Sequence, residues 1–171
     1  KCLRSSGLGC YIKGICFNSV MYADDLILMS ISISHLQKLI NICEECLGKL
    51  DLEINGSKSF ILRDGPRYNH VHITVVLNGN RVNFCNELNY LGVYLVTGKR
   101  LKINIQKSIH KFYRAANSII GKIVTFTSPM VVLSLINASC VPILLYGLNA
   151  FKLNKSELGK IDDTLNSIFY K

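Results

Sequence analysis

The hydrophobic pattern of this chain changes its period near Lys99. Between residues 10 and 97, short runs of β-branched and aromatic residues alternate with turn residues such as Gly14 and Asn18, which is typical of strands joined by tight turns. After Lys99, apolar residues recur every three or four positions, which is typical of amphipathic helices. We therefore predict an α+β fold, with an antiparallel sheet in domain 1–98 and an all-helical lobe in domain 99–171.

A helix is expected to pack on one face of this sheet. Ser34 and Gln37 have the spacing of a capping box, which predicts the start of a helix at Ser34. The apolar residues that follow at helical spacing are Leu36, Leu39, Ile40, Cys43, Leu47 and Leu50. They form one apolar face, so we expect the helix to cover the sheet through these residues.

Two Asn-Gly pairs in the same half of the chain predict turns between strands. Asn55-Gly56 lies inside segment 52–63, which is expected to form strand, turn and strand. Asn78-Gly79 is expected to be the turn of a hairpin that begins at Val71 and ends at Cys85.

The first helix of the second half is expected over residues 104–123, with the apolar stripe Ile105, Ile109, Phe112, Ala116, Ile119 and Ile123. A second, basic stripe on the same helix consists of Lys107, Lys111, Arg114 and Lys122. Such a stripe is suited to contacts with phosphate groups, and it is equally typical of a solvated helix face.

The segment 123–151 contains no charged residue and is long enough to span a membrane. Polar residues and prolines interrupt it, and Ser128-Pro129 has the pattern of a helix start within it. We therefore predict buried helices and no membrane partner. A final helix is expected to begin near Asn154, with Glu157 at its third position.

Charge is distributed unevenly along the chain. Residues 1–98 contain 9 Lys/Arg and 8 Asp/Glu, a net charge of +1, whereas residues 99–171 contain 11 Lys/Arg and 3 Asp/Glu, a net charge of +8. A strongly basic lobe favours a polyanionic partner over a small neutral substrate.

The seven cysteines are odd in number and scattered, and most of them lie in apolar stretches. This distribution favours free thiols and a reducing compartment, so we expect an intracellular protein, nuclear or cytoplasmic, that is not secreted. Cys43 and Cys46 form a lone pair at helical spacing without the further ligands of a zinc site, and we interpret them as core thiols.

The sequence Tyr22-Ala23-Asp24-Asp25 places two adjacent carboxylates between two apolar runs. Adjacent acids repel each other, and a divalent cation such as Mg²⁺ or Mn²⁺ is a suitable counter-charge because it prefers oxygen ligands. A hairpin with both acids at its turn is suited to two-metal phosphoryl chemistry. The alternative is a solvated Asp-Asp turn, which is common in hairpins.

The chain resembles the reverse transcriptases of retrotransposons without long terminal repeats. Several motifs carry the resemblance in the order of the family, and they are Ser6–Ile12, Met21–Leu26, Leu52–Ser59, Leu88–Val93 and Cys140–Gly147. They resemble, in turn, the strand before the catalytic hairpin, the aspartate hairpin, the lysine-bearing motif, the primer grip and a thumb helix. The resemblance spans nearly the whole chain and implies the C-terminal part of a polymerase palm followed by a thumb.

The resemblance implies RNA-directed DNA synthesis from deoxynucleoside triphosphates on an RNA template and a DNA primer. It implies that Asp24 binds metal, that Asp25 supports the metal site, and that Lys58 assists the leaving pyrophosphate. It further implies that Tyr22 and Ala23 lie near the primer terminus. It also implies that Tyr90, Leu91 and Gly92 belong to the primer grip. Helical spacing, and not the resemblance, adds Lys107, Lys111, Arg114 and Lys122 as candidate primer- or template-binding residues.

The chain departs from the family pattern at its start, because residues 1–23 contain no acidic residue and the family uses a further palm aspartate. Lys13 also stands where relatives often carry a small residue. We therefore expect a fragment of a longer retrotransposon polyprotein that is inactive by itself. The alternatives are a decayed remnant that only binds nucleic acid, an intron-encoded reverse transcriptase, and a small membrane protein anchored by residues 123–151.

Overall fold

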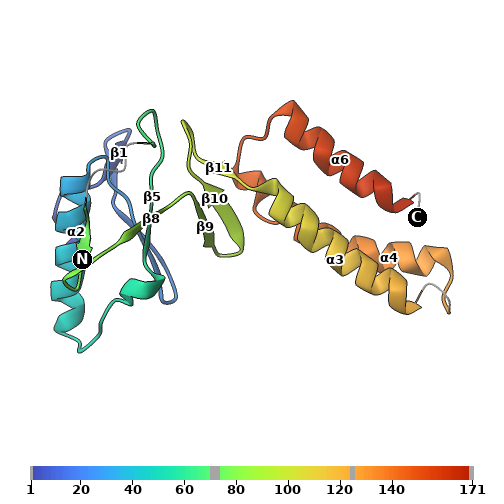
Figure 1. Cartoon of the computed structure of the whole chain (residues 1–171), viewed down its shortest axis with the longest axis horizontal. Helices are drawn as coiled ribbons and strands as arrows, with labels where there is room; N and C mark the ends of the chain where they lie inside the picture. The colour runs from blue at the N-terminus through green and yellow to red at the C-terminus, as the bar shows by residue number, and fades with distance from the viewer. Residues whose placement is uncertain (1, 70–73, 124–125, 170–171) are drawn as a thin grey trace. The chain divides into compact units, whose positions relative to one another are not determined.

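The computed structural model of the chain describes residues 2–69, 74–123 and 126–169, and these residues combine helices with small antiparallel sheets (Figure 1). The mixed α+β class expected from the sequence is therefore confirmed. The chain divides into two units: the first contains Lys1–Ile61 and Asn69–Cys85, and the second contains Leu62–Tyr68 and Asn86–Lys171. This division differs from the expected boundary at 98/99, because residues 86–98 belong with the helices.

The first unit begins with the short helix α1 (Cys2–Ser5) and continues with two hairpins in series. Strand β1 (Cys10–Ile12) pairs with β2 (Ile15–Phe17), and β3 (Ser19–Tyr22) pairs with β4 (Asp25–Leu28). Strands were expected throughout residues 10–29, and this expectation is confirmed.

Helix α2 (Ile33–Gly48) follows the second hairpin and buries Leu39, Ile40 and Cys43, as the apolar stripe predicted. Its N-cap is Ser32, whose hydroxyl accepts a hydrogen bond from the backbone N–H of His35 at 3.2 Å. The expected capping box at Ser34 is therefore wrong, since Ser34 lies inside the first turn. Gln37 instead exchanges two 2.8 Å hydrogen bonds with the backbone of Val76 and so ties the helix to a strand.

The two Asn-Gly pairs adopt different structures. Asn78 and Gly79 form the turn between β6 (Val76–Leu77) and β7 (Asn80–Arg81), with φ of 49° and 74°, so this hairpin turn is confirmed. Part of the expected first strand, residues 71–73, lies outside the described residues.

Asn55-Gly56 opens the 3₁₀ helix η1 (Gly56–Lys58), so the expected turn between two strands is wrong there. The Asn55 side chain accepts hydrogen bonds from the N–H groups of Ser57 and Lys58 and stabilises the helical turn.

The single sheet expected over residues 10–97 is not formed. In the described part of the chain the strands form separate sheets of two or three strands, including β5 (Phe60–Leu62) with β8 (Asn83–Cys85). The strands are two to four residues long, and most are closed by tight turns onto a sequence neighbour, so each offers little edge to a third strand. Several large apolar residues of β1–β3 consequently remain exposed, namely Tyr11, Ile12, Ile15, Phe17, Val20, Met21 and Tyr22.

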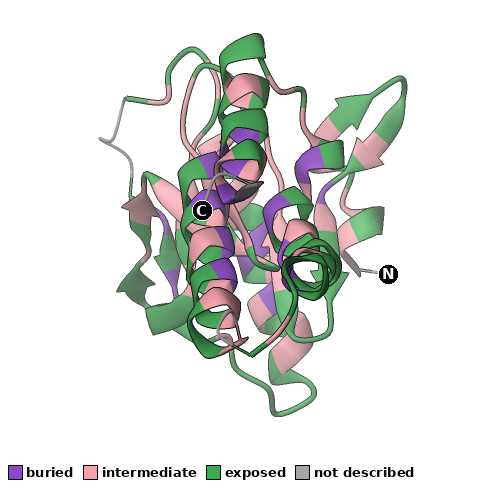
Figure 2. Cartoon of the chain, turned by 90° about the vertical axis from the view of Figure 1, so that its right-hand side faces the viewer, coloured by how far each residue is buried: buried purple, intermediate pink, exposed green. Residues whose placement is uncertain are grey.

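The second unit contains one three-stranded sheet and a group of helices. Strand β10 (Val93–Val96) lies between β9 (Glu87–Tyr90) and β11 (Lys102–Ile103). The helical elements are α3 (Ile105–Ile123), α4 (Pro129–Ser139), α5 (Val141–Leu145), η2 (Leu148–Ala150) and α6 (Lys155–Phe169). The helices carry buried and exposed residues in alternation, as expected for amphipathic helices (Figure 2).

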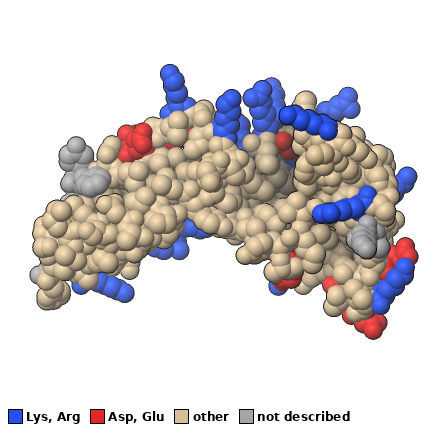
Figure 3. Space-filling view, turned by 180° about the vertical axis from the view of Figure 1, so that it is seen from behind, with Lys and Arg blue, Asp and Glu red and all other residues tan. Residues whose placement is uncertain are grey.

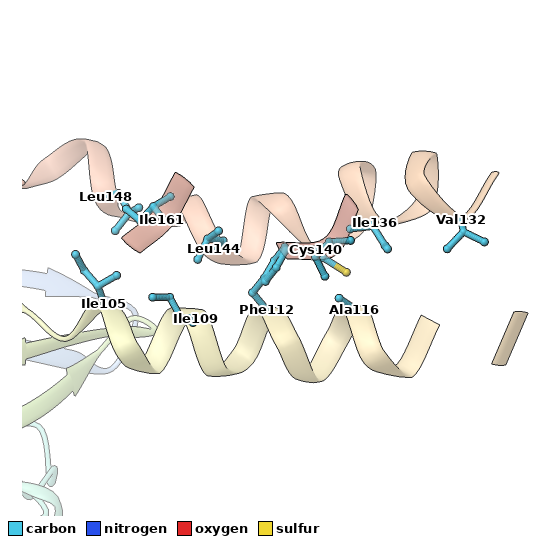
Figure 4. Packing of buried hydrophobic residues seen from close by; sticks show 11 residues of the cluster. Ile105, Ile109, Phe112, Ala116, Val132, Ile136, Cys140, Leu144, Leu148 and Ile161 are labelled. Atoms are coloured by element: carbon cyan, nitrogen blue, oxygen red, sulfur yellow. The ribbon is translucent and has the colours of Figure 1, made fainter. Parts of the chain in front are cut away.

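One core joins the helices of this unit (Figure 4). The buried residues of α3 are Ile105, Ile109, Phe112 and Ala116, and they point toward Val132, Ile136, Cys140, Leu144 and Leu148 of the segment that follows α3. The apolar stripe predicted for α3 is therefore confirmed. Ile161 and Ile168 of α6 complete the core.

Local signals set the ends of the later helices. Pro129 begins α4 directly after Ser128, as predicted, although the Ser128 side chain makes no cap hydrogen bond. At α6, the N–H of Glu157 donates to the Asn154 side chain and the N–H of Asn154 donates to the Glu157 carboxylate, both at 2.8 Å. This reciprocal pair is a capping box, and it lies at the helix start that the sequence predicted near Asn154.

The uncharged segment is not one continuous helix. Residues Pro129–Ala150 are long and apolar enough to cross a membrane by length and composition, with a mean hydropathy of 2.0. In the structure α4 ends at Ser139, and Pro142, which has no backbone N–H to donate, lies in the separate helix α5. One side of these helices is buried in the core on α3, and the absence of a membrane partner stays a prediction.

Candidate functional site

The acidic motif forms the turn of the β3–β4 hairpin. Tyr22 and Asp25 are directly opposite each other in the register, so Ala23 and Asp24 are the two turn residues. All four residues are exposed, and the Tyr22 side chain retains 63% of its accessible surface. The structure therefore presents both carboxylates to solvent at one end of a hairpin.

The backbone of this turn is strained at Ala23. Its φ is 51°, in the left-handed region that residues with a Cβ avoid at a cost of about 1–2 kcal/mol. Gly is the residue usually selected for such a position in a two-residue hairpin. The turn of the β1–β2 hairpin has the same feature, with a φ of 50° at Lys13, so the angle is a property of these short hairpins.

The carboxylates of Asp24 and Asp25 are the hard oxygen donors that Mg²⁺ and Mn²⁺ prefer. Within residues 2–69, 74–123 and 126–169 there is no group of three or more His, Cys, Asp or Glu side chains that could hold a metal ion. The pair thus fits part of a metal site, and an ion bound to it would take its remaining ligands from water or from substrate phosphates.

Lys58 is the last residue of η1, and its side chain is exposed. Asn55 fixes the backbone of this turn through hydrogen bonds of 3.1 Å to the N–H of Ser57 and 3.3 Å to the N–H of Lys58. The same turn borders an open pocket of about 650 Å³, which is also lined by Asn78 and Arg81. Lys58 lies in the same unit as the acidic hairpin, on a separate element.

The other candidate turn joins β9 and β10 in the second unit. Tyr90 pairs with Val93, so Leu91 and Gly92 are the turn residues, with φ of 48° and 85°. The positive φ of Leu91 is strained for the same reason as at Ala23. The hydroxyl of Tyr90 is buried and has no hydrogen-bond partner among the described residues, which carries a desolvation cost of about 1–3 kcal/mol.

The four cations expected on α3 are all exposed. At roughly 100° per residue, Lys107, Lys111, Arg114 and Lys122 fall within roughly 80° of the helix circumference, on the side opposite the buried stripe. Lys and Arg side chains project individually from the face of the molecule shown in Figure 3. The structure therefore places the predicted basic stripe on a solvent-facing side of α3.

Two of these cations contact the β9–β10 hairpin. The Lys107 ammonium lies 3.3 Å from the Glu87 carboxylate and 4.7 Å from the centre of the Tyr94 ring. The Lys111 ammonium donates to the Gly92 carbonyl at 3.3 Å and lies 4.9 Å from the centre of the same ring. The predicted primer-grip residues lie in a turn, although a strand was expected there, and this turn is brought together with the predicted basic stripe. Cation–π contacts hold the two lysines over Tyr94.

Glu87, Tyr94 and Asn104 were missed by the sequence reasoning. Besides its contact with Lys107, Glu87 accepts a 2.7 Å hydrogen bond from the Asn104 side chain, just before α3 begins. Its charge is the sequence signal that could have identified Glu87, because Glu87 is the only acidic residue between Asp64 and Glu157. A single carboxylate in a basic segment is a candidate for a structural ion pair.

The cysteines whose side chains are described form no disulfide bonds with one another. Burial raises the pKa of Cys43 to about 11, and the neighbouring Cys46 and Glu44 add to the shift. Burial also raises the pKa of Cys85 and Cys140. These thiols favour the protonated form in the folded chain, which is consistent with their interpretation as core residues.

We expect the chain to lose stability as the pH rises above about 9. Unfolded thiols ionise near the ordinary value of 9.0, whereas Cys43 in the folded chain stays protonated up to a pKa of about 11, so alkaline conditions favour the unfolded state. Urea unfolding under reducing conditions at about pH 8 and about pH 10 measures the effect. Replacement of Cys43 by Ala should remove part of the pH dependence, and an unchanged dependence would contradict this cause.

The comparisons with known proteins add no relative. Neither the family models, nor the curated proteins, nor the solved structures gave a match to this chain.

Proposed function

We propose that this chain is part of a reverse transcriptase that extends a DNA primer on an RNA template, with the first unit acting as palm and the helices of the second unit as thumb. The observation that carries the proposal is the acidic turn: Asp24 and Asp25 are exposed together at the turn of a short hairpin whose backbone is strained at Ala23. Two adjacent carboxylates at one exposed turn are suited to binding a divalent cation, because Mg²⁺ and Mn²⁺ prefer oxygen ligands.

In this proposal, Asp24 binds a Mg²⁺ or Mn²⁺ ion and Asp25 assists from the adjacent position. The bound ion supplies charge stabilisation for the phosphoryl group under attack. Tyr22 and Ala23 face the primer terminus, and the exposed Lys58 ammonium supplies a proton or a positive charge to the departing pyrophosphate. Deoxynucleoside triphosphates are the substrates, and the other metal ligands belong to a longer retrotransposon polyprotein.

The second unit holds the nucleic acid in this proposal. The backbone of the Tyr90–Gly92 turn and the ammonium of Lys111 meet at one place, and Arg114 continues the basic stripe along α3. Such a surface contacts phosphates and sugars, and therefore binds without sequence preference. The net charge of +8 on residues 99–171 supports a polyanionic partner in an intracellular setting.

A second candidate function is nucleic-acid binding without catalysis. The observation that favours it is the lack of a third metal-ligating side chain beside Asp24 and Asp25 among the described residues. The two functions predict the same behaviour for the second unit and differ only in the role of the acidic turn.

We expect the chain to bind an RNA–DNA hybrid with an affinity that falls steeply as salt is added. Each phosphate contact releases a condensed counterion, so log K should fall by about 0.7–0.9 per contact for each unit of log salt. Fluorescence anisotropy over a salt series measures the slope. Replacing Arg114 by Gln should reduce the slope by about 1, because one phosphate contact is removed.

Lys49→Gln is the matched control for this experiment. Lys49 is an exposed lysine of the first unit whose ammonium pairs with Glu45 at 2.8 Å. Its replacement removes the same charge outside the proposed binding surface and should leave the slope unchanged. A binding constant that is indifferent to salt, or an equal effect of the two substitutions, contradicts the proposed surface.

A further inference from the structure

The motif Cys140–Gly147, which is far from the β9–β10 hairpin in sequence, contacts that hairpin in the structure. A Cβ atom added at Gly147 would lie 2.6 Å from Cγ2 of Val93, much closer than carbon atoms approach. A Cβ added at Gly92 would lie 3.5 Å from Cε1 of Tyr146, which is ordinary contact. The hairpin turn therefore lies directly against the backbone that follows α5.

The conformation of Gly147 makes this close approach possible. Tyr146 has φ −57° and ψ 123°, and Gly147 has φ 74° and ψ −5°, which are the angles of a type II turn with Gly at its favoured position. The turn directs the chain from α5 into η2, whose Leu148 is buried in the core. Gly147 cannot move away easily, because the elements on both of its sides are packed on α3.

Val93, which an added Cβ at Gly147 would strike, is as constrained in position as Gly147. Its side chain is β-branched and has little rotational freedom, and its backbone pairs with Tyr90 at the end of the hairpin. A side chain at position 147 would therefore displace the hairpin turn itself. That turn carries the Gly92 carbonyl that receives the Lys111 ammonium, and the adjacent Tyr94 ring contacts both lysines.

We propose that Gly147 and Val93 form a positioning contact that sets the place of the Tyr90–Gly92 turn relative to Lys107 and Lys111 on α3. The contact makes the turn backbone and the two ammonium groups available together to one strand of an RNA–DNA hybrid. This inference rests on the nucleic-acid surface proposed above and assigns Gly147 a role in it. Gly147 and Val93 act through the hairpin turn and are positioning residues.

The test compares Gly147→Ala, Val93→Ala and the rescue variant Gly147→Ala/Val93→Ala in the whole chain. Gly147→Ala introduces the collision, and Val93→Ala removes the methyl group that is struck. Gly79→Ala is the matched control, because Gly79 has the same φ of 74° with no atom within 4 Å of an added Cβ, so it reports backbone strain alone. Affinity for an RNA–DNA hybrid and its salt dependence are measured by anisotropy, below the unfolding temperature of every variant.

Gly147→Ala is expected to weaken binding by about three- to tenfold and to lower the salt slope by about 1, because Lys111 no longer acts together with the turn. The rescue variant should bind within about twofold of Val93→Ala and regain the original slope. Gly79→Ala should lower the unfolding temperature without changing affinity or slope. If Gly147→Ala fails to fold, the rescue variant must still fold and bind.

The outcomes separate this inference from the proposed function. A parent chain that does not bind the hybrid overturns the nucleic-acid surface as a whole, and the positioning contact with it. A parent chain that binds, together with a Gly147→Ala variant of unchanged affinity and slope, overturns the positioning contact alone. If Gly147→Ala loses binding and the rescue variant does not regain it, the positioning contact is also overturned. The same holds if the rescue variant does not fold.

Discussion

Phe112→Ala is expected to lower the free energy of unfolding of the second unit by about 3–5 kcal/mol, the usual range for removal of a fully buried phenylalanine. The Phe112 side chain is completely buried and points from α3 toward the segment that contains Cys140 and Leu144 (Figure 4). Its ring also packs edge-on against Tyr113, with ring centres 5.6 Å apart. The substitution leaves a cavity that the surrounding helices fill only partly.

Phe126→Ala is the matched control for this prediction. Phe126 follows the same helix but retains 89% of its accessible surface, so its removal should change the free energy of unfolding by less than about 0.5 kcal/mol. Urea unfolding followed by helical circular dichroism measures both variants. Equal effects of the two substitutions would mean that the core does not form around α3 as described.

The position of Phe112 is also an example of what could be predicted from the sequence. Helix α3 was predicted nearly to the residue, because its apolar residues recur at helical spacing over five turns and its charges lie on the opposite side. The start of α6 near Asn154 was predicted for a similar reason, since Asn154 and Glu157, which cap the helix, lie within one turn of each other. Local patterns of this kind depend on few contacts distant in sequence.

The two Asn-Gly pairs show where such local signals fail. Asn78-Gly79 is flanked by strands that pair with each other, and both residues adopt positive φ. Asn55-Gly56 has the same two residues, but the Asn55 side chain caps a 3₁₀ turn and Asn55 has an extended backbone. The dipeptide favours a turn in both places, and the kind of turn depends on strand partners that the dipeptide does not encode.

The prediction of a single sheet was wrong for a related reason. The sequence identified strands within residues 10–29 and the Asn78–Gly79 hairpin turn, whereas the turn at Leu91 and Gly92 between β9 and β10 was not predicted. The sequence contains no local signal for the order in which hairpins pair. In the described residues the hairpins pair within themselves, and the exposed apolar residues of β1–β3 show how much strand surface stays uncovered.

The candidate site was likewise predicted only in part from the sequence. The acidic hairpin was predicted because its residues are adjacent, and the structure places them at one turn as expected. The contacts of Lys107 and Lys111 with Tyr94 join an α3 face to a strand, and the contact of Gly147 with Val93 spans more than fifty residues of sequence. These contacts follow from the packing of the second unit, which residue spacing alone does not reveal.

Asp24→Asn is expected to abolish primer extension in a longer polypeptide that joins this chain to upstream fingers and a palm strand with a further aspartate. Asparagine keeps the shape of the side chain and removes the charge that metal binding requires. We expect the rate to fall by at least about 1,000-fold, which corresponds to about 4 kcal/mol of transition-state stabilisation. Single-nucleotide extension of a DNA primer on an RNA template, with Mg²⁺ or Mn²⁺, measures the effect.

Asp51→Asn is the control, because Asp51 is another exposed aspartate of the first unit and its left-handed φ of 55° is tolerated by asparagine. It should extend the primer at nearly the parent rate. Binding of the RNA–DNA hybrid should be unchanged in both variants, since the proposed binding surface lies on the second unit. If Asp24→Asn extended primers as well as Asp51→Asn, the acidic turn would have no catalytic role, and nucleic-acid binding alone would remain for this chain.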